Sequence, residues 1–259
     1  MKTLTKIIIT VIFITSVFAC KKNNKANLEF TVVTVADSSR NYTNDTTISN
    51  FISISYFESK KTNSENFIAD IINQDFFAWL GSFLFAEDSV TLTKNNLNDV
   101  IATDIKRFIK DTNEDESIID CETCKHIELS IDTFLLYQNS KIVSLAYSYY
   151  QYSGGAHGFY GQIAFNYDKK DGTPVTIDNL STNIAELTAI AEQAFIKQNG
   201  ELKDYWFEDD VFFLPDAFYF TEGKITFYYS IYEIASFAAG DITVELNNDD
   251  IKHIIDYIE

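Results

Sequence analysis

The most distinctive stretch of this sequence is a loop that contains four of the chain's nine glycines and one of its three histidines, between Tyr152 and Gly161. Glycine is used where the backbone needs a positive φ or is closely approached, so the clustering predicts a shaped loop. Aromatic side chains flank it on both sides, as they do at surfaces that contact glycans or proteins. The predicted ligand-binding residues are Tyr152, Ser153, Gly154, Gly155, His157, Phe159 and Tyr160.

His157 is the residue of this loop best suited to proton transfer or ligand contact, since a neutral imidazole serves both. No serine and acid stand around it at the spacing of a catalytic triad. The three histidines His126, His157 and His253 are too scattered for the paired spacing of a metal-dependent deacetylase. We therefore expect no catalytic residue, metal site or cofactor. A structural role in the turn remains the simplest interpretation of His157, ahead of ligand contact.

Two further acidic or thiol motifs leave alternatives open. Glu208–Asp210 beside Trp206 has the oxygen ligands of a calcium site, but a solvated acidic surface is the simpler interpretation. Cys121 and Cys124 form a CxxC motif in which we expect a local disulfide. Free thiols are the next alternative, followed by a metal or redox role.

The N-terminus has the pattern of a secretory signal. Lys2 and Lys6 precede an uncharged apolar run at residues 7–18, which is shorter than the roughly 20 residues of a membrane-spanning helix. Ala19 directly before Cys20 resembles the lipobox of bacterial lipoproteins, which implies cleavage after residue 19 and acylation of Cys20. Ordinary secretion with a passive Cys20 is the alternative. We expect a signal peptide at 1–19 and a lipidated tether at 20–27.

The charge of the chain limits its partners. The formal net charge is −18, and it becomes −20 without residues 1–19, which hold two lysines and no acid. Such a chain disfavours nucleic acid and attracts cationic proteins by long-range steering. The excess of acidic residues also serves simple solubility.

Hydrophobic periodicity predicts an α+β fold with two adjoining sub-domains of antiparallel sheet packed with helices. Period-two patterns predict strands at 28–36, 48–57, 127–137, 142–149, 163–167, 218–220, 225–229 and 242–246. Period-3.6 patterns predict helices from Asn63 or Ser64 to Trp79, and at 95–110, 184–198 and 249–258. The polar stretch 37–47 is expected to connect the first two strands.

A family resemblance rests on motifs in the second half of the chain. They are Tyr152–Gly158, Phe165–Asp168 with Gly172, Ile177–Leu180, Phe227–Ala235 and Ala239–Gly240, in this order. The chain resembles the extracytoplasmic domain pair shared by RsiV-type anti-sigma factors and the non-catalytic N-terminal part of PdaC-type peptidoglycan deacetylases. The resemblance implies a PdaC-like domain at 28–125 and an RsiV-like domain at 126–259. It also implies direct binding of lysozyme.

These patterns predict a cell-envelope binding or sensing protein without catalysis, anchored by the acylated Cys20 and facing the periplasm or the exterior of a bacterium. Its expected ligand is a cationic protein such as lysozyme or a cell-wall glycan. We expect no anti-sigma activity, because the sequence shows neither a sigma-binding segment nor a membrane helix. The alternative is a cell-wall-acting hydrolase or a deacetylase accessory enzyme.

Overall fold

The computed structural model describes residues 27–43, 46–59, 66–85, 91–114, 126–154 and 156–259. Cys20, Cys121, Cys124 and Gly155 lie outside these ranges. The chain forms two compact units, one from Glu29–Thr133 and Tyr149–Tyr160, the other mainly from Phe134–Ser148 and Gly161–Glu259. The division therefore runs through three strands, whereas the domain boundary expected from the sequence lies between residues 125 and 126.

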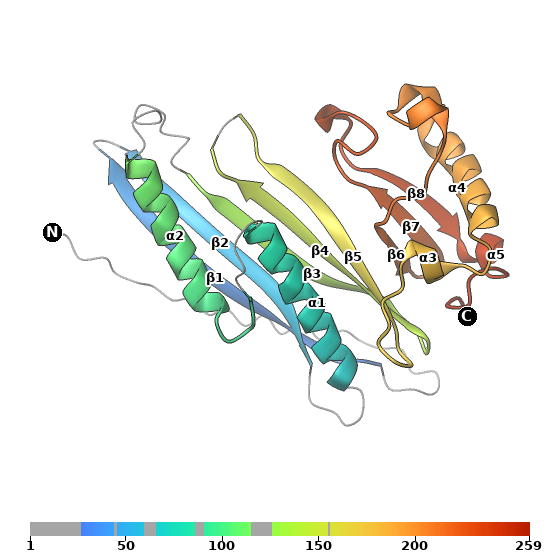
Figure 1. Cartoon of the computed structure of the whole chain (residues 1–259), viewed down its shortest axis with the longest axis horizontal. Helices are drawn as coiled ribbons and strands as arrows, with labels where there is room; N and C mark the ends of the chain where they lie inside the picture. Colours follow the sequence, from blue (N-terminus) through green and yellow to red (C-terminus); the bar gives the residue numbers. More distant parts are fainter. Residues whose placement is uncertain (1–26, 44–45, 60–65, 86–90, 115–125, 155) are drawn as a thin grey trace. The chain divides into compact units, whose positions relative to one another are not determined.

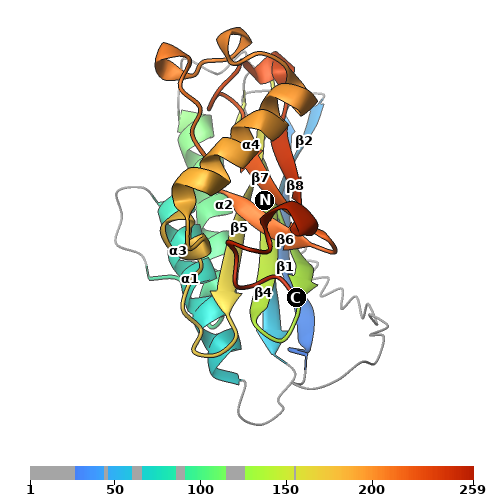
Figure 2. The same ribbon diagram turned by 90° about the vertical axis from the view of Figure 1, so that its right-hand side faces the viewer.

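The first unit is built on two long strands with helices on one face. β1 (Phe30–Thr43) and β2 (Thr46–Ser59) pair antiparallel over their whole length, from Phe30↔Ser59 to Thr43↔Thr46. The polar stretch expected as a connection is thus mostly strand. α1 (Asn66–Leu84) and α2 (Leu97–Glu114) lie over the same face of these strands (Figures 1 and 2).

The third strand of this sheet corrects one expectation. β3 (Glu128–Gln138) pairs with β2 in parallel, with Phe51↔Glu128 and Ile54↔Ile131 in register. A parallel pair needs a long crossover connection, and the chain between these strands passes through α1 and α2. The fold class is confirmed as α+β, but this sheet is mixed rather than antiparallel. Its strand order is β1-β2-β3-β4-β5, where β4 is Ile142–Tyr152 and β5 is Phe159–Asp168.

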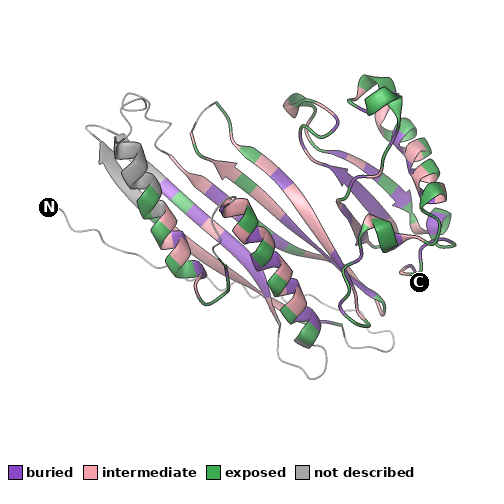
Figure 3. Cartoon of the chain, viewed as in Figure 1, coloured by how far each residue is buried: buried purple, intermediate pink, exposed green. Residues whose placement is uncertain are grey.

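The helix α1 buries a stripe of residues spaced by four, Ile68, Ile72, Phe76 and Leu80. Tyr56 of β2 contacts the rings of Phe76 and Phe77. Phe67, by contrast, is exposed. Figure 3 shows the buried side of α1 turned toward the strands. This packing fixes which face of the sheet is covered by helices in this unit.

The second unit is built on an antiparallel sheet of order β6-β7-β8, from β6 (Phe218–Thr221), β7 (Lys224–Tyr229) and β8 (Ile242–Asn247). The two strands predicted at 218–220 and 225–229 are confirmed, and they form a hairpin whose turn is Glu222 and Gly223. α4 (Ile184–Asn199) packs against β8 and buries Leu187, Ala191 and Phe195 at spacing four (Figure 2). Asn183 caps its start, and Gly200 with φ 110° ends it.

Short elements complete this unit, namely α3 (Ile177–Leu180), α5 (Asn248–Ile251) and the 3₁₀ turns Leu202–Asp204, Glu208–Asp210 and Phe237–Ala239. The helix expected at 249–258 ends at Ile251. Beyond Ile251, side chains of other segments donate hydrogen bonds to the carbonyl oxygens of Ile254 and Tyr257. These bonds take the place of the backbone hydrogen bonds of a helix. None of the described helices is both long and apolar enough to cross a membrane.

Candidate functional site

The glycine loop joins β4 to β5, as the sequence predicted. Gly154 adopts φ 93°, a conformation that side chains with a Cβ disfavour. The exposed His157 donates from Nδ1 to the carbonyl oxygen of Gly158, 3.0 Å away. This bond within the turn shows that the imidazole helps to shape the loop. Its other ring nitrogen is not required for that role.

Residue 158 is a glycine for a different reason, because the ring of Tyr150 lies against its backbone. A Cβ on residue 158 would come within 2.5 Å of Tyr150 Cε2 and 2.6 Å of its Oη. Such a distance is far below van der Waals contact. The position of the Tyr150 ring thus depends on the absence of a side chain at residue 158.

The structure divides the predicted site residues between the two faces of the sheet. Tyr149 contacts Trp79 and Phe83 of α1, and Phe159 contacts Tyr149 with ring centroids 6.0 Å apart, so these rings are on the helix side. Tyr152 points the other way by strand alternation, and its ring lies 5.5 Å from that of His126. Tyr152 and Phe159 therefore do not form one site.

The second unit carries an exposed apolar group that the sequence analysis did not identify as a binding site. We call Trp206, Val211, Phe213 and Tyr232 the Trp206 surface; these side chains are 57%, 65%, 41% and 51% exposed. The amide of Trp206 donates to the carbonyl of Ile234 at 2.8 Å. The hydroxyl of Tyr229 donates to the carbonyl of Phe213 at 2.5 Å. These bonds bring the segments around residues 206–213 and 229–234 side by side.

Acidic residues accompany the Trp206 surface, namely Glu208, Asp209, Asp210, Asp216 and Glu233. The only basic residue between positions 205 and 251 is Lys224, which is paired with Glu245 at 2.6 Å. Burial raises the pKa of Glu233, the hydrogen bond from the Ser230 amide opposes this, and nearby Asp216 adds to the rise. Acidic residues thus outnumber basic ones in the segments that carry the exposed rings.

Three residues in this region hold strained backbone conformations. Asp209, Asp210 and Tyr232 have φ values of 54°, 58° and 68° without being glycine. Such conformations cost about 1–3 kcal/mol each and tend to occur at functional sites. The tight turns they form display the carboxylates and the Tyr232 ring outward. In the sequence, only the acidic triplet Glu208–Asp210 beside Trp206 pointed to this region, whereas nothing in the sequence marked the turn at Tyr232.

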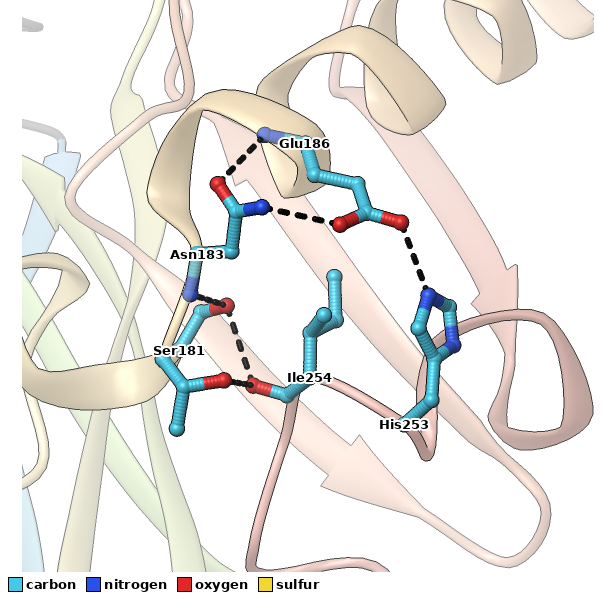
Figure 4. Close-up of polar contacts among 6 residues, drawn as sticks. Ser181, Asn183, Glu186, His253 and Ile254 are labelled. Carbon is cyan, nitrogen blue, oxygen red and sulfur yellow. Dashed lines mark hydrogen bonds and ion pairs between the residues drawn. The ribbon is translucent and has the colours of Figure 1, made fainter.

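A serine, a glutamate and a histidine also come together in this unit (Figure 4). His253 Nε2 lies 2.8 Å from Glu186 Oε1, and Asn183 Nδ2 donates to Glu186 Oε2 at 2.9 Å. The hydroxyl of Ser181, however, donates to the carbonyl of Ile254 at 3.0 Å. A nucleophilic serine needs its proton directed at a base. This network instead caps α4 and holds the segment after α5.

A concave pocket of about 460 Å³ lies near that network, lined among others by Lys141, Asp168, Ser181 and Tyr257. Many of its polar groups serve the fold. Lys141 Nζ donates to the carbonyl of Asp256, and Ser181 and Thr182 donate to Ile254. Across the described residues, no group of three or more His, Cys, Asp or Glu side chains is arranged to hold a metal ion.

Comparison with known families identifies the chain's relatives. The family model described as "Deacetylase PdaC" matches residues 21–160, more than half of the chain. The chain belongs to the PdaC family. A second model, "Protein of unknown function (DUF3298)", matches residues 175–249. The two matches confirm the resemblance to the extracytoplasmic domain pair.

A curated relative of this PdaC-family chain is the peptidoglycan-N-acetylmuramic acid deacetylase PdaC of Bacillus subtilis strain 168, 26% identical over 166 residues. The match takes in 59% of this chain and 34% of the relative, so the chain spans about a third of that protein's length. The deacetylase activity in that name belongs to the relative.

Two solved structures share the fold. A member of the DUF3298 family from Bacteroides fragilis superposes with a TM-score of 0.70 at 21% identity, covering 90% of this chain and 95% of that one. A DUF3298 family protein from Pseudomonas aeruginosa gives 0.57 at 15% identity, covering 88% and 94%.

Proposed function

We propose that this chain is a lipid-anchored binding protein of the bacterial envelope that captures a cationic protein such as lysozyme and catalyses no reaction itself. The Trp206 surface is the observation that carries the proposal. Tryptophan and tyrosine are the residues that most often dominate protein interfaces, because their rings bury a large area at low entropic cost. Here two of them are exposed, together with Val211 and Phe213.

The charge around this surface supports a basic partner. Five carboxylates accompany the exposed rings, against two described basic residues in the neighbouring segments, Lys203 and the Lys224 that pairs with Glu245. Charge complementarity accelerates encounter and excludes partners of the same sign. The formal net charge of −18 adds a long-range attraction for cationic proteins. An acyl group on Cys20 would hold the binding units at the membrane surface.

A binding titration with lysozyme tests the proposal. The protein is the chain from residue 20 onward with Cys20→Ser, so that no acyl group is needed. We expect Trp206→Ala combined with Tyr232→Ala to weaken binding by at least tenfold, about 1.4 kcal/mol. Phe67→Ala removes a ring that is 41% exposed from the other unit and should leave the affinity unchanged. Equal affinity of all three proteins would contradict the proposed surface.

A second candidate function, a cell-wall-acting hydrolase or deacetylase accessory enzyme, is favoured by the name of the Bacillus subtilis relative. Release of acetate or of sugar fragments from peptidoglycan measures it directly. We expect no turnover above that of buffer alone. Turnover that is lost on His157→Ala would replace the binding proposal by an enzymatic one.

A further inference from the structure

We infer that the first unit carries a separate binding site for an amino-sugar glycan, a sugar chain with free ammonium groups, on the face of its sheet opposite α1 and α2. The residues that form it are Phe51, His126, Glu128, Ser130, Asp132, Tyr150 and Tyr152, which we call the open face. The inference is independent of the protein ligand proposed for the Trp206 surface, since the residues belong to the other unit.

The first step is the orientation of β2. Ile52, Ile54 and Tyr56 are buried, and the Tyr56 ring contacts Phe76 and Phe77 of α1. Side chains of a strand alternate between faces. Phe51 therefore points away from the helices, and its side chain is 39% exposed.

The register of β3 against β2 extends this face by one strand. Phe51 pairs with Glu128 and Ser53 pairs with Ser130, and paired residues point to the same side. Asp132 follows by alternation. The hydroxyl of Ser130 lies 3.3 Å from Asp132 Oδ2, which confirms that these two side chains share a face. Asp132 is exposed and Glu128 is half-exposed.

The end of β4 adds two rings. Tyr149 contacts α1, so Tyr150 and Tyr152 point to the open face, where Tyr152 meets the His126 ring at 5.5 Å. Tyr150 is 37% exposed, and the backbone of Gly158 lies against its ring. A ring held in place before the ligand arrives loses less entropy on binding.

The spacing and chemistry of these groups suit a sugar chain. β2 and β4 flank β3 at about 4.7–4.9 Å each, so the two strands that carry the rings lie about 10 Å apart, a span that neighbouring sugar units of one chain cover. Aromatic faces take the apolar C–H face of a pyranose. Carboxylates accept hydrogen bonds from hydroxyl groups and bind ammonium groups by charge.

The carboxylates decide which kind of sugar is preferred. Glu128 lies on β3 between the strands that carry Phe51 and Tyr152, and Asp132 lies four residues further along β3. His126 Nε2 lies 3.7 Å from Glu128 Oε2, and the imidazole adds a positive charge to this face only when it is protonated. A negative site complements a glycan whose amino groups are unacetylated and positively charged. An N-acetylated chain has no such charge, and a glycan rich in carboxylates is repelled.

The test compares two oligosaccharides of equal length, hexameric glucosamine and hexameric N-acetylglucosamine, by calorimetric titration at low salt. It uses the same Cys20→Ser chain as above. We expect the glucosamine hexamer to bind at least tenfold more tightly, and added salt to reduce this difference. Equal or tighter binding of the N-acetylated hexamer would overturn the assigned ligand class.

Variants then locate the site. Tyr150→Ala and Asp132→Asn should each weaken binding of the glucosamine hexamer at least fivefold, while Phe67→Ala, which removes an exposed ring from α1 on the other face of the sheet, should not. Thermal unfolding checks that each variant is folded. Unchanged binding in both open-face variants would overturn the site. Lysozyme binding by these variants reports on the Trp206 surface separately, so failure of one inference is distinguishable from failure of the other.

Discussion

The ring of Tyr150 lies directly against the backbone of Gly158, so close that any Cβ on residue 158 would overlap Tyr150 Cε2 at 2.5 Å. The atoms in conflict belong to the far end of one partly exposed side chain. The ring can therefore swing outward, and the sheet itself need not shift. This relationship couples the glycine loop to the open face.

Gly158→Ala should consequently displace the Tyr150 ring without unfolding the protein. We expect affinity for the glucosamine hexamer to fall by about as much as in Tyr150→Ala, with the free energy of unfolding reduced by no more than about 1–2 kcal/mol. Ala156→Ser, in the same loop and exposed, serves as the control. Wild-type affinity in Gly158→Ala would show that the ring position is unimportant.

Asn166 connects three segments in the buried part of the second unit. It accepts the Ser144 hydroxyl at 2.6 Å and donates to the carbonyl of Phe218 at 2.8 Å, while Ser144 accepts the amide of Phe220. Asn166→Ala leaves buried polar groups unsatisfied and should lower the free energy of unfolding by about 1–3 kcal/mol. Urea unfolding measures this. The exposed Asn95→Ala should change it by less than about 0.5 kcal/mol.

We expect Glu233 to make the stability of the second unit depend on pH. Burial raises its folded-state pKa above the ordinary 4.5, so the folded form binds the proton more tightly than the unfolded form. Its contribution to stability therefore falls as pH rises from 4.5 through the raised pKa. Glu233→Gln keeps an acceptor for the Ser230 amide and should stabilise the protein at pH 7 but not at pH 4. A larger stabilisation at pH 4 than at pH 7 would contradict this assignment.

Cys20 is expected to determine where the protein resides. Cys20→Ser should move the chain from the membrane fraction to the soluble fraction of bacteria, because two or three acyl chains anchor a protein stably. Mass spectrometry of the native protein should show an increase of two or three acyl groups on residue 20. An unmodified membrane-bound chain would contradict the anchor.

Local signals predicted the regular elements well. The turn at Glu222 and Gly223 and the cap and stop of α4 follow from local chemistry that the sequence displays. The parallel β2–β3 pair could not be seen, because pairing partners distant in sequence leave no local pattern. The early end of the last helix could not be predicted for the same reason, because side chains distant in sequence donate hydrogen bonds to the carbonyls that follow it.

The sites were less predictable than the fold. Strand alternation places Tyr150 and Tyr152 together on the face of the sheet away from Tyr149. It did not show that Phe159 belongs with Tyr149 on the other. The Trp206 surface depends on Tyr232, 26 positions from Trp206, and the two segments are joined by the hydrogen bond from the Trp206 amide to the carbonyl of Ile234.

The segment at residues 254–259 has a consequence for how the protein acquires its shape. It bonds to residues 139–141 and 181–182, more than 70 positions earlier, and buries Ile255. Contacts of such long sequence separation form slowly. While a ribosome is still making this chain, residues 254–259 have not yet joined the second unit, and its apolar strands are not yet covered by them. A chain that must stay unfolded until translocation is finished would benefit from this delay.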